Sequence, residues 1–176
     1  MVKIIAAVRD NDEMKKALAS SLDTVFLLKS DIVGLPSVLQ RFHDAGKKVF
    51  IHMDFADGVG KDTYGCLYLK NLGVDGIIST RTGIIKCAKD NGIVTVQRVF
   101  IVDSHSISTA VDTVEKTAPD MIELMPGIAT KAISFFRQRV KMPIIAGGLI
   151  QTMEEVSEAQ LAGADAISTG SVSLWN

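Results

Sequence analysis

The chain has 176 residues, of which 47% are hydrophobic and 22% are charged, a composition that excludes an intrinsically disordered protein. Its 19 basic and 20 acidic residues leave a formal net charge of -1, so the overall charge provides no attraction for nucleic acid. The two cysteines, Cys66 and Cys87, are too few for a disulfide framework, which favours a reducing cytoplasm. The first apolar run is too short for a signal peptide or a membrane span, so we expect no membrane partner.

Short apolar runs rich in Ile and Val alternate with longer stretches of helical spacing, which predicts alternating strands and helices. About eight runs occur, at residues 3–8, 24–28, 48–52, 76–79, 94–99, 121–124, 143–146 and 166–169. Their starts lie roughly 18 to 28 residues apart, close to the shortest unit in which a strand, a turn and a helix lead to a parallel strand. The runs are continuous rather than alternating in hydrophobicity, as expected for a parallel sheet covered by helices.

Turn and cap residues predict where helices begin and end. Asn11 or Asp12 is expected to cap the first helix, and further helices are expected at residues 35–45, 82–90, 106–117 and 154–162. Eight such units in so short a chain predict an α/β fold, a compact (β/α)8 TIM barrel that forms a single domain over residues 1–176. Because only 171–176 follow the eighth strand, the last helix is expected to be vestigial or missing, with Trp175 docking the tail onto the barrel.

The functional face of such a barrel lies where the strands end, so the residues just after each apolar run are the candidates. Gly147 and Gly148 follow the seventh run, and Gly170 and Ser171 follow the eighth. Barrels that bind phosphate commonly use these two loops, because glycine lets backbone amides approach the oxygens. The pattern therefore predicts a phosphate site, with a tight turn as the alternative explanation of the glycine pair.

Charged side chains after the other runs leave several interpretations open. Arg81 and Arg98 offer guanidinium groups that fit a phosphate, or they form internal salt bridges with Asp54 or Glu123. The spacing His52-x-Asp54 fits a metal pair, an acid-base pair or a hydroxyl-binding network. Since no third ligand with recognisable spacing is nearby, we expect no metal ion and no cofactor. No catalytic motif of known spacing is present, and we assign no catalytic residue.

Ordered motifs along the whole chain resemble those of the glycerol uptake operon antiterminators, cytoplasmic regulators that respond to glycerol 3-phosphate and act on leader RNA. They include Ala7-Val8-Arg9, His52-x-Asp54, Asp75-Gly76-Ile77-Ile78-Ser79-Thr80-Arg81, Gln97-Arg98-x-Phe100, Met125-Pro126-Gly127, Ile145-Ala146-Gly147-Gly148-Leu149-Ile150 and Leu174-Trp175. One departure is Gln151, where similar proteins often carry a basic residue. The resemblance implies a barrel that regulates glycerol metabolism genes by transcription antitermination.

The resemblance also implies a ligand site. The phosphate of glycerol 3-phosphate would lie at Gly147, Gly148, Gly170 and Ser171, near Arg81 and Arg98. The polar groups around the rest of the ligand would be Lys29, His52, Asp54 and Glu123. The implied partners are glycerol 3-phosphate and a leader mRNA hairpin, and a homo-oligomer would double any RNA-binding patch.

The alternative function is a phosphosugar isomerase, lyase or phosphodiesterase that uses Asp54, Glu123 or Lys29 for proton transfer at the same phosphate site. Small basic groups offer candidate RNA contacts, although each also fits a solvated helix face. They are Lys15 and Lys16, Arg41 with Lys47 and Lys48, and Arg137 with Arg139 and Lys141.

Overall fold

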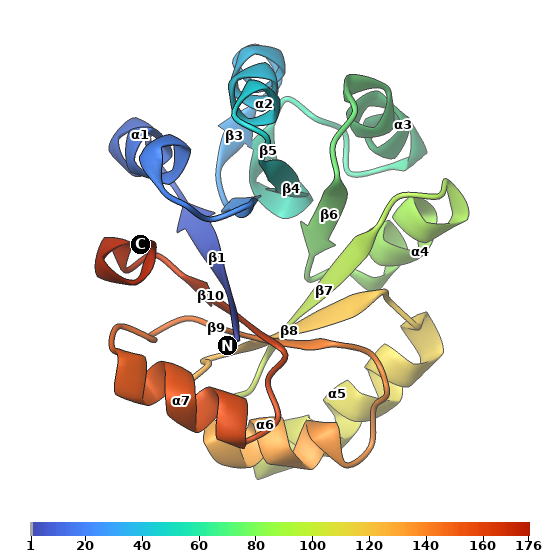
Figure 1. Cartoon of the computed structure of the whole chain (residues 1–176). Coiled ribbons are helices and arrows are strands. Elements are labelled where there is room, and N and C mark those ends of the chain that lie inside the picture. Colours follow the sequence, from blue (N-terminus) through green and yellow to red (C-terminus); the bar gives the residue numbers. More distant parts are fainter. Residues whose placement is uncertain (1) are drawn as a thin grey trace.

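The computed structural model describes residues 2–176 and contains eight parallel strands closed into a barrel, ringed by helices (Figure 1). Around the barrel the strands follow the order β1-β10-β9-β8-β7-β6-β4-β2. Their bounds are Lys3–Val8 for β1, Thr24–Leu27 for β2, Lys48–His52 for β4, Gly76–Ser79 for β6, Thr95–Phe100 for β7, Met121–Met125 for β8, Ile144–Gly147 for β9 and Ala166–Thr169 for β10. The predicted (β/α)8 barrel is confirmed, and every predicted strand end lies within one residue of the observed one.

Seven α-helices lie within the described residues, outside the strands (Figure 1). Their bounds are Asn11–Ala19 for α1, Leu35–Asp44 for α2, Thr63–Leu72 for α3, Thr82–Asp90 for α4, Ser104–Thr117 for α5, Thr130–Arg137 for α6 and Met153–Leu161 for α7. The expected cap of α1 was wrong. Asp10 caps it, since its carboxylate accepts hydrogen bonds from the amides of Asp12 and Glu13.

The eighth helix is reduced to the short 3-10 turn η2, Val172–Leu174, as expected. Trp175 follows it, is 1% exposed, and donates a hydrogen bond from Nε1 to the carbonyl of Thr169 at 2.9 Å. This contact docks the tail against the end of β10 beside α1 (Figure 1). Among residues 2–176, no helix has the length and apolar character needed to cross a bilayer.

Inside the barrel, apolar and polar side chains form successive layers along the strands. Phe26, Phe50, Ile78, Val96 and Ile145 pack together in the lower interior. Because side chains on one face of a strand recur every second residue, the next inward positions after Val96 and Ile145 are 98 and 147. The charged residue Arg98 and the small residue Gly147 therefore lie in the upper layer, at the barrel mouth.

Three short additional elements extend the mouth on the side of β2 and β4. The strands β3, Ser30–Asp31, and β5, Ala56–Asp57, pair in parallel as a separate two-stranded sheet. The 3-10 turn η1, Met53–Phe55, connects β4 to β5. The sequence analysis did not predict these elements, which link the loops after β2 and β4 above the barrel.

Candidate functional site

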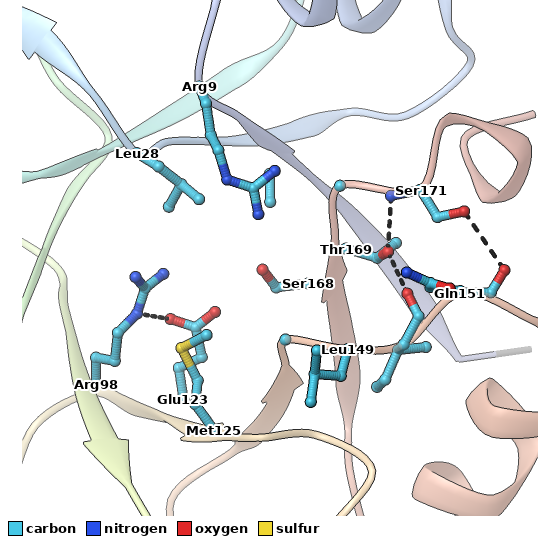
Figure 2. Close-up of a pocket in the computed structure, with 14 residues that line it drawn as sticks. Arg9, Leu28, Arg98, Glu123, Met125, Leu149, Gln151, Ser168, Thr169 and Ser171 are labelled. Atoms are coloured by element: carbon cyan, nitrogen blue, oxygen red, sulfur yellow. Dashed lines mark hydrogen bonds and ion pairs between the residues drawn. The ribbon is translucent and has the colours of Figure 1, made fainter.

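A cavity of about 300 Å³ opens at the carboxyl ends of β1, β7, β8 and β10 (Figure 2). Its polar wall comes from two arginines, one carboxylate, and the loops after β9 and β10. The lining residues that matter here are Arg9, Arg98, Glu123, Gly148, Gln151, Ser168, Gly170 and Ser171. Five of them, Arg98, Glu123, Gly148, Gly170 and Ser171, are among the predicted site residues.

Arg98 and Glu123 form a buried ion pair on the neighbouring strands β7 and β8. Arg98 Nε lies 2.7 Å from Glu123 Oε2, and their side chains are 8% and 1% exposed. Taking both charges out of water is unfavourable, so the attraction and the hydrogen bond between them must offset that loss. The terminal nitrogens of the guanidinium lie on its other side, toward the cavity (Figure 2). They are available for a second anion.

Arg9 faces the same cavity from the end of β1 (Figure 2). Its backbone amide donates to Glu13 Oε2 at 2.6 Å, while its guanidinium has only a long contact of 3.4 Å with Glu13 Oε1. The side chain is 58% exposed, so its charge is hydrated and weakly held. Its place directly after the first predicted strand puts Arg9 among the polar residues expected at the barrel mouth, but the predicted ligand-binding residues did not include it.

Glycines let these side chains pass close to the backbone. A Cβ atom on Gly170 would lie 2.7 Å from Arg9 Nη1, and one on Gly147 would lie 2.4 Å from Glu123 Oε1. Gly148 and Leu149 have φ values of +79° and +64°, so two successive left-handed residues turn the chain at the cavity wall. Backbone strain at a residue such as Leu149 is typical of functional sites.

A hydrogen bond connects the end of β10 to the loop after β9. Thr169 Oγ1 donates to the carbonyl of Ile150 at 2.7 Å and accepts a hydrogen bond from the amide of Ser171 at 3.0 Å. Within residues 2–176, the amides of Gly148 and Gly170 donate no hydrogen bond. Two free amides thus border a cavity that two arginines face.

His52 and Asp54 lie outside the cavity lining. His52 is 1% exposed, its ring centroid is 4.9 Å from that of Phe55, and neither ring nitrogen has a partner among residues 2–176. Burial, together with the nearby charge of Arg98, lowers the pKa of His52 to about 4, so the ring is neutral. Asp54 instead accepts hydrogen bonds from Ser79 Oγ and from the amide and hydroxyl of Thr80, at 2.6 to 2.8 Å.

These hydrogen bonds decide the charge state of Asp54. Partial burial alone would raise its pKa, but the donors on Ser79 and Thr80 hold the pKa below its usual value. The carboxylate therefore clamps η1 to the loop after β6, and its oxygens are occupied. Lys29 lies on the rim, in an adjoining hollow that also contains Phe55 and Asp57. Arg81 is exposed at the start of α4, away from the cavity lining.

Three comparisons place the chain among known proteins. Residues 4–175 match the family model described as glycerol-3-phosphate responsive antiterminator. The chain belongs to this family. The Escherichia coli (strain K12) protein YgcP is 34% identical over 173 residues, which cover 98% of this chain and 91% of YgcP.

Solved structures agree with this membership in the antiterminator family. The glycerol uptake operon antiterminator regulatory protein of Listeria monocytogenes has a TM-score of 0.93 and 35% identity, covering 98% of this chain and 94% of that one. A glycerol uptake operon antiterminator-related protein of Thermotoga maritima has a TM-score of 0.88 and 40% identity, covering 99% of each chain. Aldolase barrels at 12% to 17% identity share the fold alone.

The neutral state of His52 predicts a pH dependence of stability. With a folded pKa of about 4 against roughly 6.5 unfolded, the unfolded chain binds the proton first as pH falls. The free energy of unfolding should therefore decrease by roughly 2 kcal/mol between pH 7 and pH 5 through this residue. Urea denaturation of the wild type and of His52→Gln at both pH values measures it.

In His52→Gln, the free energy of unfolding should no longer show the part of the decrease between pH 7 and pH 5 that His52 contributes. His105→Gln, which changes an exposed histidine, should show the full decrease. An equal decrease in the wild type and in His52→Gln would contradict the assignment of a buried, neutral His52.

Proposed function

We propose that the protein is a glycerol 3-phosphate sensor that acts in the cytoplasm and controls transcription antitermination by binding a leader mRNA hairpin. Family membership supports the general role. The observation that carries the ligand assignment is the convergence of Arg9, Arg98 and the free amides of Gly148 and Gly170 on one cavity. Guanidinium groups bind phosphate oxygens through paired, charge-assisted hydrogen bonds, and glycine amides add donors without steric hindrance.

The remaining lining fits the glycerol end of the ligand. Glu123, Ser168 and Gln151 offer acceptors and donors for two hydroxyl groups. A cavity of about 300 Å³ is at the small end of the range of ligand pockets, which suits a three-carbon phosphoester. Of the residues predicted for this end, Glu123 lines the cavity, Lys29 lies in the adjoining hollow, and His52 and Asp54 lie outside the cavity lining. Gln151 supplies a neutral amide to the cavity lining.

A sensor accounts for these side chains better than a phosphosugar enzyme does. Among residues 2–176 no lysine lines the cavity itself, and Lys29 lies in the adjoining hollow, so the cavity lining provides no amine for a Schiff base. The carboxylate of Asp54 accepts three hydrogen bonds, so it is not free to act as a general base. In Glu123, Oε2 is held by Arg98 Nε, which leaves Oε1 to accept a hydrogen bond from a ligand hydroxyl. Ligand binding would instead favour one arrangement of the loops, with a coupling free energy of about 1–3 kcal/mol to RNA binding.

Replacing Arg9 tests the ligand assignment with little risk to the fold. Arg9→Met should weaken glycerol 3-phosphate binding by about tenfold or more, because a hydrogen bond to a charged group is worth about 1.5–3 kcal/mol. Thermal-shift titration with glycerol 3-phosphate, glycerol and inorganic phosphate measures the change. In the wild type, ligand at 100 times its dissociation constant should stabilise the fold by about 2.7 kcal/mol.

Arg139→Met is the matched control, because Arg139 lies 3.4 Å from the ring centroid of Phe135, on the outer helix α6 side. Arg81→Met should also bind like the wild type, since Arg81 is outside the cavity. Absence of a shift in the wild type at millimolar glycerol 3-phosphate would contradict the sensor. Consumption of the ligand during long incubation would favour the enzyme.

RNA binding should depend on the ligand. We expect glycerol 3-phosphate to tighten binding of the wild type to its operon leader hairpin by about 5- to 150-fold, the range of typical allosteric coupling. Fluorescence anisotropy with labelled leader RNA, with and without ligand, measures this factor. Equal affinity in both conditions would contradict ligand control, and a scrambled hairpin controls for nonspecific attraction.

A further inference from the structure

A second hollow, of about 380 Å³, lies at the end of β7 between α4 and α5, which are neighbouring helices (Figure 1). We call it the α4–α5 groove. The side chains used below to argue its chemistry are Thr82, Gln97, Arg98, Phe100 and Thr109. No part of the proposed ligand chemistry uses Gln97, Phe100 or the threonines.

Gln97 is the unusual feature of the groove. It precedes Arg98 on β7, so its side chain faces the helices while that of Arg98 faces the barrel interior. Gln97 is 3% exposed, and its amide oxygen has no hydrogen-bond partner among residues 2–176. Leaving a buried acceptor unpaired is unfavourable, so retention of an amide at this site points to a partner from outside the chain.

The other walls of the groove supply a flat apolar surface and further polar groups. Phe100 lines the groove at the end of β7 and is 56% exposed, which is uncommon for a phenylalanine that serves only packing. Thr82 at the start of α4 and Thr109 on α5 add hydroxyl groups from opposite sides. Gln97 and Phe100 thus line the same groove, and an aromatic ring together with an amide is a combination by which proteins hold an unstacked base of RNA.

Cations flank the groove on its α4 side. Arg81 is exposed and immediately precedes Thr82, and Lys86 lies one helical turn after Thr82 on the same face of α4. Phosphates on either side of a base bound in the groove would meet these charges. The fold also accounts for Arg81 in this way, since it lies outside the cavity for which it was predicted.

Two of the candidate basic residues, Lys47 and Arg137, are engaged in contacts within the fold. Lys47 is 6% exposed and donates to the carbonyls of Ser20 and Leu22. Arg137 pairs with Asp165 at 3.0 Å. Lys47 and Arg137 are therefore engaged within the chain, whereas nearby charge, an aromatic ring and an unpaired amide oxygen occur together at the α4–α5 groove.

We propose that the α4–α5 groove binds one unstacked nucleobase of the RNA, stacked on Phe100 and hydrogen-bonded to the amide of Gln97. This inference rests on the proposed RNA-binding function and assigns its contact surface. Arg98 lines both the groove and the cavity. A ligand phosphate that engages the Arg98 side chain in the barrel interior would act on the residue next to Gln97, which connects the two sites through β7.

The test uses the full-length protein and a labelled RNA that is selected on it from a random pool in the presence of glycerol 3-phosphate. Phe100→Ala and Gln97→Met should each weaken binding of this RNA by at least about tenfold, because a stacked base and its hydrogen bonds are lost. Phe100→Trp should restore binding, since stacking needs only an aromatic face. Gln97→Met should fold normally, because it removes an unpaired buried amide.

Matched controls separate the groove from general surface effects. Tyr64→Ala removes an aromatic ring that is 82% exposed at the start of α3, and Gln138→Met replaces an exposed amide after α6. Both should bind the RNA like the wild type. Each variant should keep the thermal shift with glycerol 3-phosphate, which shows that its cavity is intact.

Two results would overturn the inference, and they are distinguishable. If the wild type binds the selected RNA and both groove variants bind it within twofold of the wild type, the groove is not the base site, while the proposed function stands. If no RNA is recovered on a wild type that responds to glycerol 3-phosphate, the RNA-binding function fails and the groove assignment fails with it.

Discussion

The buried ion pair between Arg98 and Glu123 organises the mouth of the barrel. With a separation of 2.7 Å and almost no exposure, each charge depends on the other, and removing one would leave an uncompensated charge in the interior. The pair fixes the guanidinium so that its free nitrogens face the cavity (Figure 2). The same charge helps to keep His52 neutral. The arrangement of charge at the barrel mouth therefore depends on one ion pair between the neighbouring strands β7 and β8.

Glycine at the loop positions is the second constraint. A side chain at Gly147 would collide with the buried Glu123, so the loop after β9 approaches that carboxylate only because the position lacks a Cβ atom. A side chain at Gly170 would displace the flexible end of Arg9. The close approach leaves backbone amides beside a positively charged cavity. This arrangement favours an anion at the mouth and accounts for a phosphate ester better than for an uncharged sugar.

Continuous apolar runs made the eight strands predictable to within one residue, because barrel strands are buried on both faces. The loop glycines and the short tail were also predictable, because they directly follow predicted strands. The sequence pattern placed Arg9 at the barrel mouth but did not identify it as a ligand-binding residue, and it did not reveal the satisfied hydrogen bonds of Asp54. Both depend on contacts between segments far apart in the chain, such as Asp54 with Thr80. The α4–α5 groove could not be predicted from the sequence either, because no sequence pattern indicates that a buried amide lacks a hydrogen-bond partner.

Within the antiterminator family, this chain is best understood as a binding barrel whose carboxylates are engaged in structure and whose arginines remain open to a ligand. The central claim is that one phosphate lies between Arg9 and Arg98. A crystal structure of the protein with bound glycerol 3-phosphate tests this claim most directly. The account predicts phosphate density that contacts both guanidinium groups and the amides of Gly148 and Gly170. Density for the ligand at another site, with this cavity empty at saturating concentration, would contradict it.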